Sequence, residues 1–266
     1  MKYWDDKNEN LIINADTIRR FNKENPLSGR YACDERVLGD VANSLINKNS
    51  KFEDVYHMVT LINSFYSTRM GGDDCYALSK ILYNRHGDIL GAMDSGDKNV
   101  VQSVIKDQVD AREKHDEHGV PVLRSVAFSF TSKYFSIISR YRFHNDKFPI
   151  YDSLVAGLLD FWYRNKGTNV VSKTRKNYNY IEYCKYINRF CRVVEYKELD
   201  SYLWTLGRKI VPYVTDISAE EYKRLMPGKD LKTGKDKYTI AITSSLPSDT
   251  MERILKAVAR DDQKSR

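Results

Sequence analysis

A lysine and an aspartate stand out because each is predicted to open a helix and they lie nineteen positions apart. Lys133 follows Ala127-Phe-Ser-Phe-Thr-Ser, and Asp152 follows Pro149-Ile-Tyr. A lysine amine is a nucleophile when neutral, and burial or neighbouring positive charge lowers the pKa of a lysine. An aspartate carboxylate stabilises positive charge that develops beside it. These residue types could therefore supply a nucleophile and an electrostatic partner.

The same residues also have an ordinary structural interpretation. Lys133 could be a surface lysine on an amphipathic helix. Asp152 could be the N-cap of the helix that contains Leu154 and Val155. Capping does not exclude catalysis, so both interpretations stay open. His144 lies between the two residues in the sequence and is a candidate neighbour of the site.

Helices are predicted to position these residues. Apolar residues recur at spacings of three and four throughout residues 1–214, which is typical of helices that bury one face. The clearest runs are Val55, Met58, Val59, Ile62 and Phe65, then Leu154, Val155, Leu158, Leu159 and Trp162. We predict an all-α domain over residues 1–214, with Asp97 as an N-cap and a turn at residues 71–74.

Residues 215–266 differ from the preceding part and are predicted to form a short basic C-terminal extension. Residues 227–237 are polar and lack periodicity, and residues 238–242 are a short apolar run that could form a strand. An amphipathic helix is predicted from Met251 to Arg260, with Ser248 or Asp249 as its N-cap.

Composition excludes several classes of protein. The chain has 266 residues, 30% charged and 41% hydrophobic, so a packed core is expected. It has no apolar run of the roughly 18 residues that span a membrane, and its first residues are charged, so we expect a cytoplasmic protein with no membrane partner. The four cysteines lack the close pairing of a zinc site, and His115 and His118 have no third ligand nearby. We therefore expect reduced thiols, no metal and no cofactor.

Positive charge is concentrated in one part of the chain. Residues 124–210 contain sixteen basic and seven acidic residues, a net +9, whereas the whole chain carries +7. Such an excess is typical of a surface that meets a polyanion, and also of a solvated face without a partner. Aromatic residues alternate with basic ones near its end and could stack unpaired bases or pack in the core; they are Tyr178, Tyr180, Tyr183, Tyr186 and Phe190.

Residues 127–152 resemble the helix-hairpin-helix DNA glycosylase superfamily, in particular the 8-oxoguanine DNA glycosylases. In that family a hairpin ends in a catalytic lysine, and a segment with proline and the essential aspartate follows at a similar distance. Residues 60–69 resemble the polar turn that pushes an asparagine into the space left by a flipped nucleotide. Residues 199–204 resemble the helix that closes the domain. The resemblance spans roughly residues 40–210.

The resemblance implies a two-lobed helical fold with a short C-terminal extension, and DNA as the partner, single-stranded or with a modified base. It implies that Lys133 attacks the sugar and that Asp152 stabilises the positive charge formed as the base leaves. A Schiff base on the lysine would add strand nicking, an AP lyase activity. The implied nucleic-acid contacts are Asn63, Ser129, Thr131, Ser132 and Arg140.

Three hypotheses follow. The first is an enzyme of DNA repair that excises a damaged or modified base. The second is a non-catalytic nucleic-acid-binding module on the same scaffold, and the third is an accessory protein of phage defence. Ser129 and Thr131 replace the two glycines of the family's hairpin, which favours the second and third. The lysine and aspartate at the family's distance favour the first. The oligomeric state is not predicted.

Overall fold

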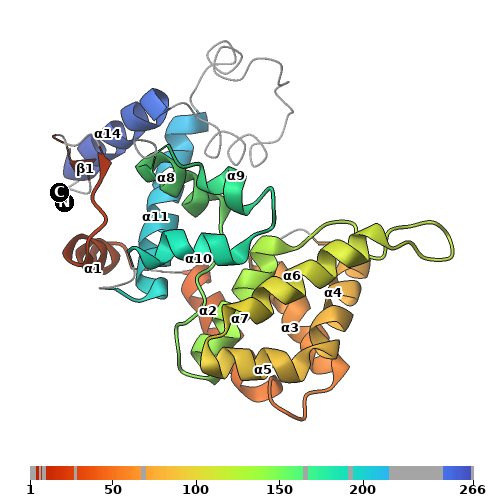
Figure 1. The fold of residues 1–266 in the computed structure, drawn as a ribbon. Coiled ribbons are helices and arrows are strands. Elements are labelled where there is room, and N and C mark those ends of the chain that lie inside the picture. Colours follow the sequence, from red (N-terminus) through yellow and green to blue (C-terminus); the bar gives the residue numbers. More distant parts are fainter. Residues whose placement is uncertain are drawn as a thin grey trace. The chain divides into compact units, whose positions relative to one another are not determined.

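The computed structural model describes residues 4–5, 7, 10–26, 29–66, 70–163, 167–190, 194–215 and 248–264 (Figure 1). These residues form helices joined by loops, together with one two-stranded antiparallel sheet, so the prediction of an all-α fold is confirmed. The chain divides into two compact units. Unit 1 comprises residues 1–26, 152–177 and 186–266, and unit 2 comprises residues 27–151 and 178–185.

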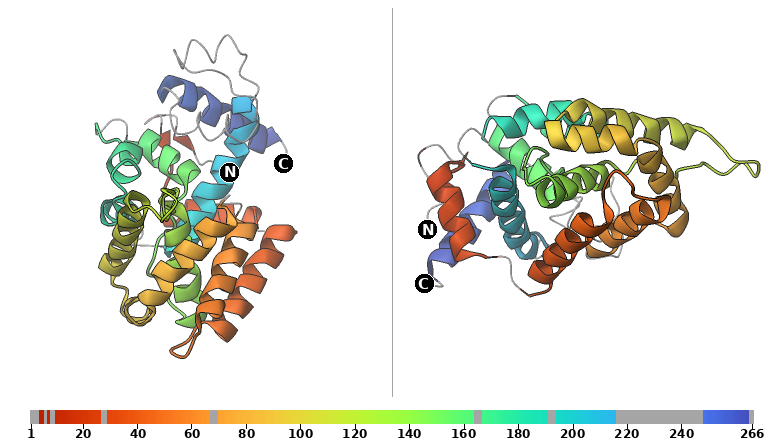
Figure 2. Two further views of the ribbon diagram at one scale, coloured as in Figure 1. Left: turned by 90° about the vertical axis from the view of Figure 1, so that its right-hand side faces the viewer. Right: turned by 90° about the horizontal axis from the view of Figure 1, so that it is seen from below.

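Unit 2 is a helical bundle. Its helices are α2 (Arg30–Leu45), α3 (Phe52–Phe65), α4 (Gly72–Asn84), α5 (His86–Ser95), α6 (Lys98–Glu113) and α7 (Phe128–Arg142). α7 packs against α2, α3, α5 and α6, and α3 and α4 lie side by side (Figure 2). α10 (Tyr180–Asn188) begins in this unit and ends in unit 1. α7 is therefore the central element of unit 2.

The start of α7 differs from the prediction that Lys133 opens a helix. α7 begins at Phe128, so Lys133 lies in its second turn and residues 128–132 are helical rather than a hairpin. Within this turn the Thr131 hydroxyl donates to the Ala127 carbonyl over 2.9 Å and the Ser132 hydroxyl donates to the Ser129 carbonyl over 2.8 Å. The rings of Phe128 and Phe130 are buried, so tertiary packing holds the first turn in the core.

Gln108 of α6 fixes this first turn from outside α7. Its side-chain oxygen accepts from the Ala127 backbone N–H over 2.8 Å, and its amide donates to the Thr131 hydroxyl over 2.7 Å. Gln108 is fully buried. It therefore supplies the side-chain bond that the start of α7 needs, because the N-cap residue Ala127 has no side-chain acceptor.

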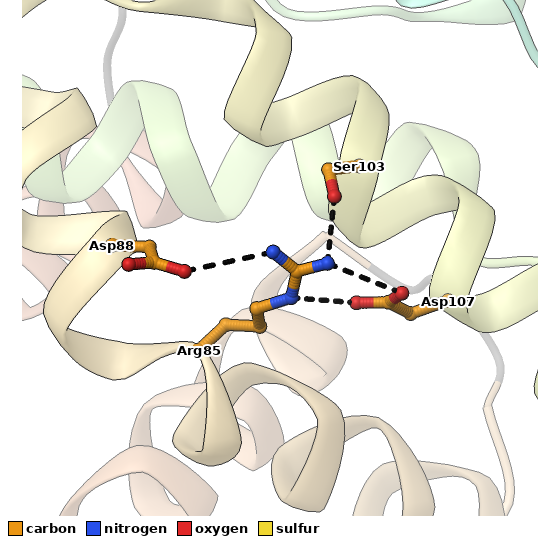
Figure 3. A network of polar contacts seen from close by, with 4 residues as sticks. All are labelled: Arg85, Asp88, Ser103 and Asp107. Atoms are coloured by element: carbon orange, nitrogen blue, oxygen red, sulfur yellow. Dashed lines mark hydrogen bonds and ion pairs between the residues drawn. The ribbon is translucent and has the colours of Figure 1, made fainter.

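Arg85 ties the junction of α4 and α5 to α6 (Figure 3). Its Nε and Nη2 donate to the two carboxylate oxygens of Asp107 over 2.9 and 3.3 Å, and Nη2 also donates to the Ser103 hydroxyl over 2.7 Å. Its Nη1 lies 3.5 Å from Asp88. The bonds to Asp107 raise the pKa of Arg85. Every nitrogen of this guanidinium has a partner.

Unit 1 contains the remaining elements. They are β1 (Trp4–Asp5), β2 (Asn10–Leu11), α1 (Ala15–Glu24), α8 (Ser153–Tyr163), α9 (Val170–Thr174), α11 (Tyr196–Thr215) and α14 (Ser248–Lys264). α11 packs against α1, α8 and α14, and α14 also contacts β1. Asp160 of α8 accepts bonds from the backbone N–H groups of Val170 and Val171 at the start of α9. Burial raises the pKa of Asp160 to about 6, although these two bonds lower it.

Several predicted boundaries can be compared with the structure. Asp97 is the N-cap of α6, and its carboxylate accepts from the Asn99 backbone N–H, as predicted. Gly71 is the N-cap of α4, so the predicted turn includes the start of that helix. The C-terminal helix α14 begins at Ser248. Ser248 and Asp249 therefore lie in its first turn, and neither is the N-cap. The predicted loop and strand at residues 227–242 lie outside the described residues.

The described part of the chain contains no helix that is long and apolar enough to cross a membrane. Cys75 and Cys184 are buried free thiols and Cys33 is an exposed one. Cys191 lies outside the described residues.

Candidate active site

Lys133 is buried on α7, and its amine contacts a hydroxyl and an aromatic ring. The residue is 6% exposed. Its Nζ donates to the Ser129 hydroxyl, one turn earlier, over 2.8 Å, and lies 5.3 Å from the centre of the Tyr66 ring. Burying a lysine head group costs free energy, and fully buried lysines are rare. The interpretation of Lys133 as a surface lysine is therefore wrong.

Ser129 connects this amine to the chain just before Asp152. While it accepts from Lys133, its hydroxyl donates to the Tyr151 carbonyl over 2.9 Å. The Tyr151 backbone N–H in turn donates to the Ser132 hydroxyl over 2.9 Å. Two side chains of α7 thus bind both backbone groups of the residue that precedes Asp152.

Asp152 is the N-cap of α8. Its carboxylate accepts from the Leu154 backbone N–H over 2.8 Å, and its carbonyl accepts from the Ala156 N–H over 2.8 Å. The capping interpretation is confirmed. Asp152 belongs to unit 1 and Lys133 to unit 2. The pairing of their side chains stays a prediction.

Glu35 of α2 holds two tyrosines beside α7. Its Oε1 accepts from the Tyr66 hydroxyl over 2.7 Å, and its Oε2 accepts from the Tyr141 hydroxyl over 3.0 Å. The Glu35 side chain is 18% exposed. Burial, together with the Glu35 charge, raises the pKa of Tyr141 to about 12. The Tyr141 hydroxyl therefore remains a donor at neutral pH.

Arg140 lies two turns beyond Lys133 on α7. Its Nη1 is 3.8 Å from Glu35 Oε2, and its Nε donates to the Ser136 carbonyl over 3.3 Å. Its Nη2 is buried and has no hydrogen-bond partner among the described residues. Burial alone would lower the pKa of Arg140, but the charge of Glu35 and the neighbouring tyrosines raise it overall. Arg140 is charged and held inside the unit.

The other predicted nucleic-acid contacts on α7 differ in exposure. Ser129 is half-buried, whereas Thr131 and Ser132 are fully buried with their hydroxyls bonded inside unit 2. Neither of these two hydroxyls lies at a surface that nucleic acid can reach.

Asn63 fixes a loop within unit 2. Its amide donates to the Met70 carbonyl over 3.0 Å, and its side-chain oxygen accepts from the Met70 N–H over 3.1 Å. The side chain thus closes the connection between α3 and α4. Arg69, in the same predicted turn, lies outside the described residues.

The interleaved aromatic residues pack in the core. Tyr180 and Tyr183 are fully buried, and their hydroxyls donate to the carbonyls of Pro149 and Ile150 over 2.8 Å each. Tyr186 and Phe190 are also buried, and Tyr178 is half-buried. Core packing is therefore the correct interpretation of the four buried rings. His144 is exposed just after α7.

Nothing in the sequence indicates that Tyr66 lies beside Lys133 or that Glu35 binds Tyr66. Glu35 lies on a different helix, and Tyr66 follows the C-terminus of α3. Only the packing of α2 and α3 on α7 brings them together. Within the part of the chain that the structure describes, no group of three or more His, Cys, Asp or Glu side chains could hold a metal ion.

Comparison with known proteins shows that Lys133 and the residues around it in unit 2 lie inside a family domain. Residues 13–147 match the family model HI_0787_N, described as an N-terminal domain. An uncharacterized protein from Haemophilus influenzae is 30% identical over 181 residues, which cover 66% of this chain and 78% of that protein. No solved structure matches. The family match includes Glu35, Tyr66, Lys133 and Arg140 and ends before Asp152. By this match over half of its length, the chain belongs to the HI_0787_N family.

Proposed function

We propose that the protein is a divergent glycosylase-like enzyme that releases a damaged or modified base from DNA, with Lys133 carried by a continuous helix in place of the family's hairpin. The observation that carries the proposal is the buried Lys133 amine, which is held by a hydroxyl and the face of an aromatic ring. A fold that maintains a lysine in this environment accepts a cost in stability, which is typical of a functional group. The net +9 of residues 124–210 supports a polyanionic substrate.

The chemistry of the proposal needs one nucleophile and one anion. The Lys133 lone pair forms a bond to C1′ of the target nucleotide while the glycosidic C–N bond breaks. The departing base keeps the electron pair of the C–N bond and takes up a proton. The lysine nitrogen then loses a proton, its lone pair forms a C=N bond to C1′ as the C1′–O4′ bond breaks, and O4′ takes up a proton, which leaves a protonated Schiff base. Asp152 stabilises the positive charge that develops on the sugar.

The helical start of α7 changes how DNA would be held. Because Thr131 and Ser132 are buried, we assign the phosphate contacts to exposed basic residues of the +9 stretch and not to these hydroxyls. Each phosphate neutralised by such a residue releases counterion, so the affinity for DNA should fall steeply as salt rises. Ser129, which is half-buried, is assigned to the amine and not to DNA.

Borohydride trapping tests the proposed chemistry. Duplexes with an abasic site or an oxidised purine are incubated with the protein, and reduction converts a Schiff base into a stable amine. Lys133→Gln should lower adduct formation at least about 1,000-fold and leave binding nearly intact. Lys147→Gln is the matched control, since it also removes a lysine amine. That amine donates to the Asp94 carbonyl at the end of α5, so its loss should leave adduct formation unchanged. An adduct that survives Lys133→Gln would contradict the proposal.

Two further results separate the hypotheses. Asp152→Asn should slow base release, and it should also destabilise α8 because it alters the cap, so the folded fraction is measured first. Salt-dependent binding without an adduct on any duplex would favour the non-catalytic module. No binding at low salt would exclude both nucleic-acid hypotheses.

A further inference from the structure

We infer that Glu35 and Tyr66 are positioning residues that orient the Lys133 amine. The inference rests on the proposed function, because it gives these residues a role in the reaction of that lysine. Glu35 fixes the hydroxyl of Tyr66, and the Tyr66 ring limits where the amine can lie.

These residues form a continuous chain of contacts. The Tyr66 hydroxyl donates to Glu35 Oε1 over 2.7 Å, and the centre of the Tyr66 ring lies 5.3 Å from Lys133 Nζ. The Ser129 hydroxyl accepts from the same amine over 2.8 Å. A hydroxyl one turn earlier on α7 and a ring from the end of α3 therefore constrain the amine in two directions.

The flexibility of lysine makes such constraints valuable. Its side chain has four rotatable bonds and about 2 kcal/mol of rotamer entropy. Attack requires the nitrogen to lie about 3–3.5 Å from the electrophilic carbon, and a displacement of about 1 Å can cost about 100-fold in rate. A ring whose far end is anchored cannot rotate away, so it keeps the amine near the reactive position.

Glu35 acts as an anchor and not as a base. One of its oxygens accepts from Tyr66 and the other from Tyr141, while Arg140 lies 3.8 Å away. Both oxygens of this carboxylate are thus engaged by tyrosine hydroxyls. It is poorly suited to remove a proton during the reaction.

Tyr141 provides a matched control within the same cluster. Its hydroxyl binds the same carboxylate, but its ring packs where α2 has Gly39: a Cβ on Gly39 would lie 2.7 Å from the Tyr141 ring. The Arg140 guanidinium lies 5.6 Å from the centre of that ring. Tyr66→Phe and Tyr141→Phe thus each remove one hydroxyl bond to Glu35, and only the first alters a ring beside Lys133.

The experiment measures single-turnover trapping on abasic-site DNA together with DNA affinity. Tyr66→Phe should lower the trapping rate about 10-fold with unchanged affinity, and Tyr66→Leu about 100-fold, because the second removes the ring as well. Tyr141→Phe should react at the wild-type rate. If the substitutions acted only by damaging the fold, both Phe variants would have a lower folded fraction. The trapping rate and the DNA affinity would then fall together.

Glu35→Gln tests the anchor, with a double variant to control for altered stability. Glu35→Gln should lower the trapping rate about as much as Tyr66→Phe, and adding it to Tyr66→Phe should have little further effect, since both break one route. If the wild type forms no adduct, the proposed function fails and this inference fails with it. If the wild type forms an adduct on Lys133 but Tyr66→Phe reacts at the same rate, only this inference fails.

Discussion

Unit 2 contains an Arg85 network and a Glu35 network, each with an arginine and a carboxylate. In the first the arginine donates to several acceptors, and in the second the carboxylate accepts from several donors. At Arg85 every guanidinium nitrogen has a partner, and Asp107 accepts two of its bonds (Figure 3). At Arg140 the carboxylate is the hub, because Glu35 accepts from two tyrosines and lies 3.8 Å from the arginine. Arg140 Nη2 stays buried without a hydrogen-bond partner among the described residues.

The difference separates a network that satisfies its own groups from one to which we assign a role in the proposed function. The Arg85 network satisfies its own groups and joins the end of α4 to α6, which is sufficient reason for it to exist. The Glu35 network leaves a donor unsatisfied, which costs free energy, and it leads through Tyr66 to a buried lysine amine. A protein that tolerates this cost gains something other than stability.

The largest expected effect is on reactivity and concerns the two networks directly. Arg85→Met should leave the rate of Schiff-base trapping per folded molecule unchanged, because none of the partners of Arg85 contacts Lys133. Lys133→Gln should abolish trapping. The rates are measured with the folded fraction determined in parallel by circular dichroism. A loss of trapping in folded Arg85→Met protein would break the distinction.

Stability should separate the networks next. Glu35→Ala should lower the free energy of unfolding by about 3 kcal/mol, because it leaves the buried Arg140 without its nearby carboxylate. Arg85→Met should cost only about 1 kcal/mol, since the Arg85 and Asp107 side chains are each about one-third exposed. Urea denaturation measures both values. Equal losses in the free energy of unfolding would show that Glu35 contributes no more to stability than Arg85 does.

A carboxylate of unit 1 extends the comparison to pH. Asp160 is bonded to two backbone N–H groups, and burial raises its pKa from 3.8 to about 6. Between these two values the folded state binds a proton that the unfolded chain releases, so stability should fall as pH rises from about 4 to 6. Urea denaturation at several pH values measures this slope. Asp160→Asn should flatten it, and an unchanged slope would assign the effect to another group.

Salt should give the smallest effect. The Asp88 side chain is 65% exposed and lies 3.5 Å from Arg85, so Asp88→Asn should cost at most about 0.5 kcal/mol in dilute buffer. That cost should disappear in about 1 M salt, where screening is nearly complete. The cost of Glu35→Ala should persist in the same salt, because the Arg140 and Glu35 side chains are only 11% and 18% exposed. Thermal unfolding at both salt concentrations compares them.

The sequence predicts the helices and several caps well because these features are local. Spacing alone identifies the apolar face of α3, and Asp97 is an N-cap because its carboxylate reaches an N–H two residues away. The start of α7 could not be predicted in the same way. Whether Thr131 faces outward or bonds to Gln108 depends on the packing of α6, which is a tertiary contact.

The candidate site was predictable only in part. Lys133 and Asp152 stand out by type and spacing, and the capping role of Asp152 follows from its position before α8. Glu35 and Tyr66 carry no such signal, because their link to Lys133 requires α2 and α3 to pack on α7. The burial of Ser132 also follows from packing, since its hydroxyl accepts from the Tyr151 backbone.

Mass spectrometry of the trapped adduct identifies which lysine is the nucleophile. Wild-type protein is trapped with borohydride on abasic-site DNA, digested, and analysed by mass spectrometry to locate the modified lysine. The account predicts that the adduct lies on the peptide that contains Lys133. An adduct confined to other lysines such as Lys147 or Lys185, or no adduct at any salt concentration, would show that Lys133 is not the nucleophile.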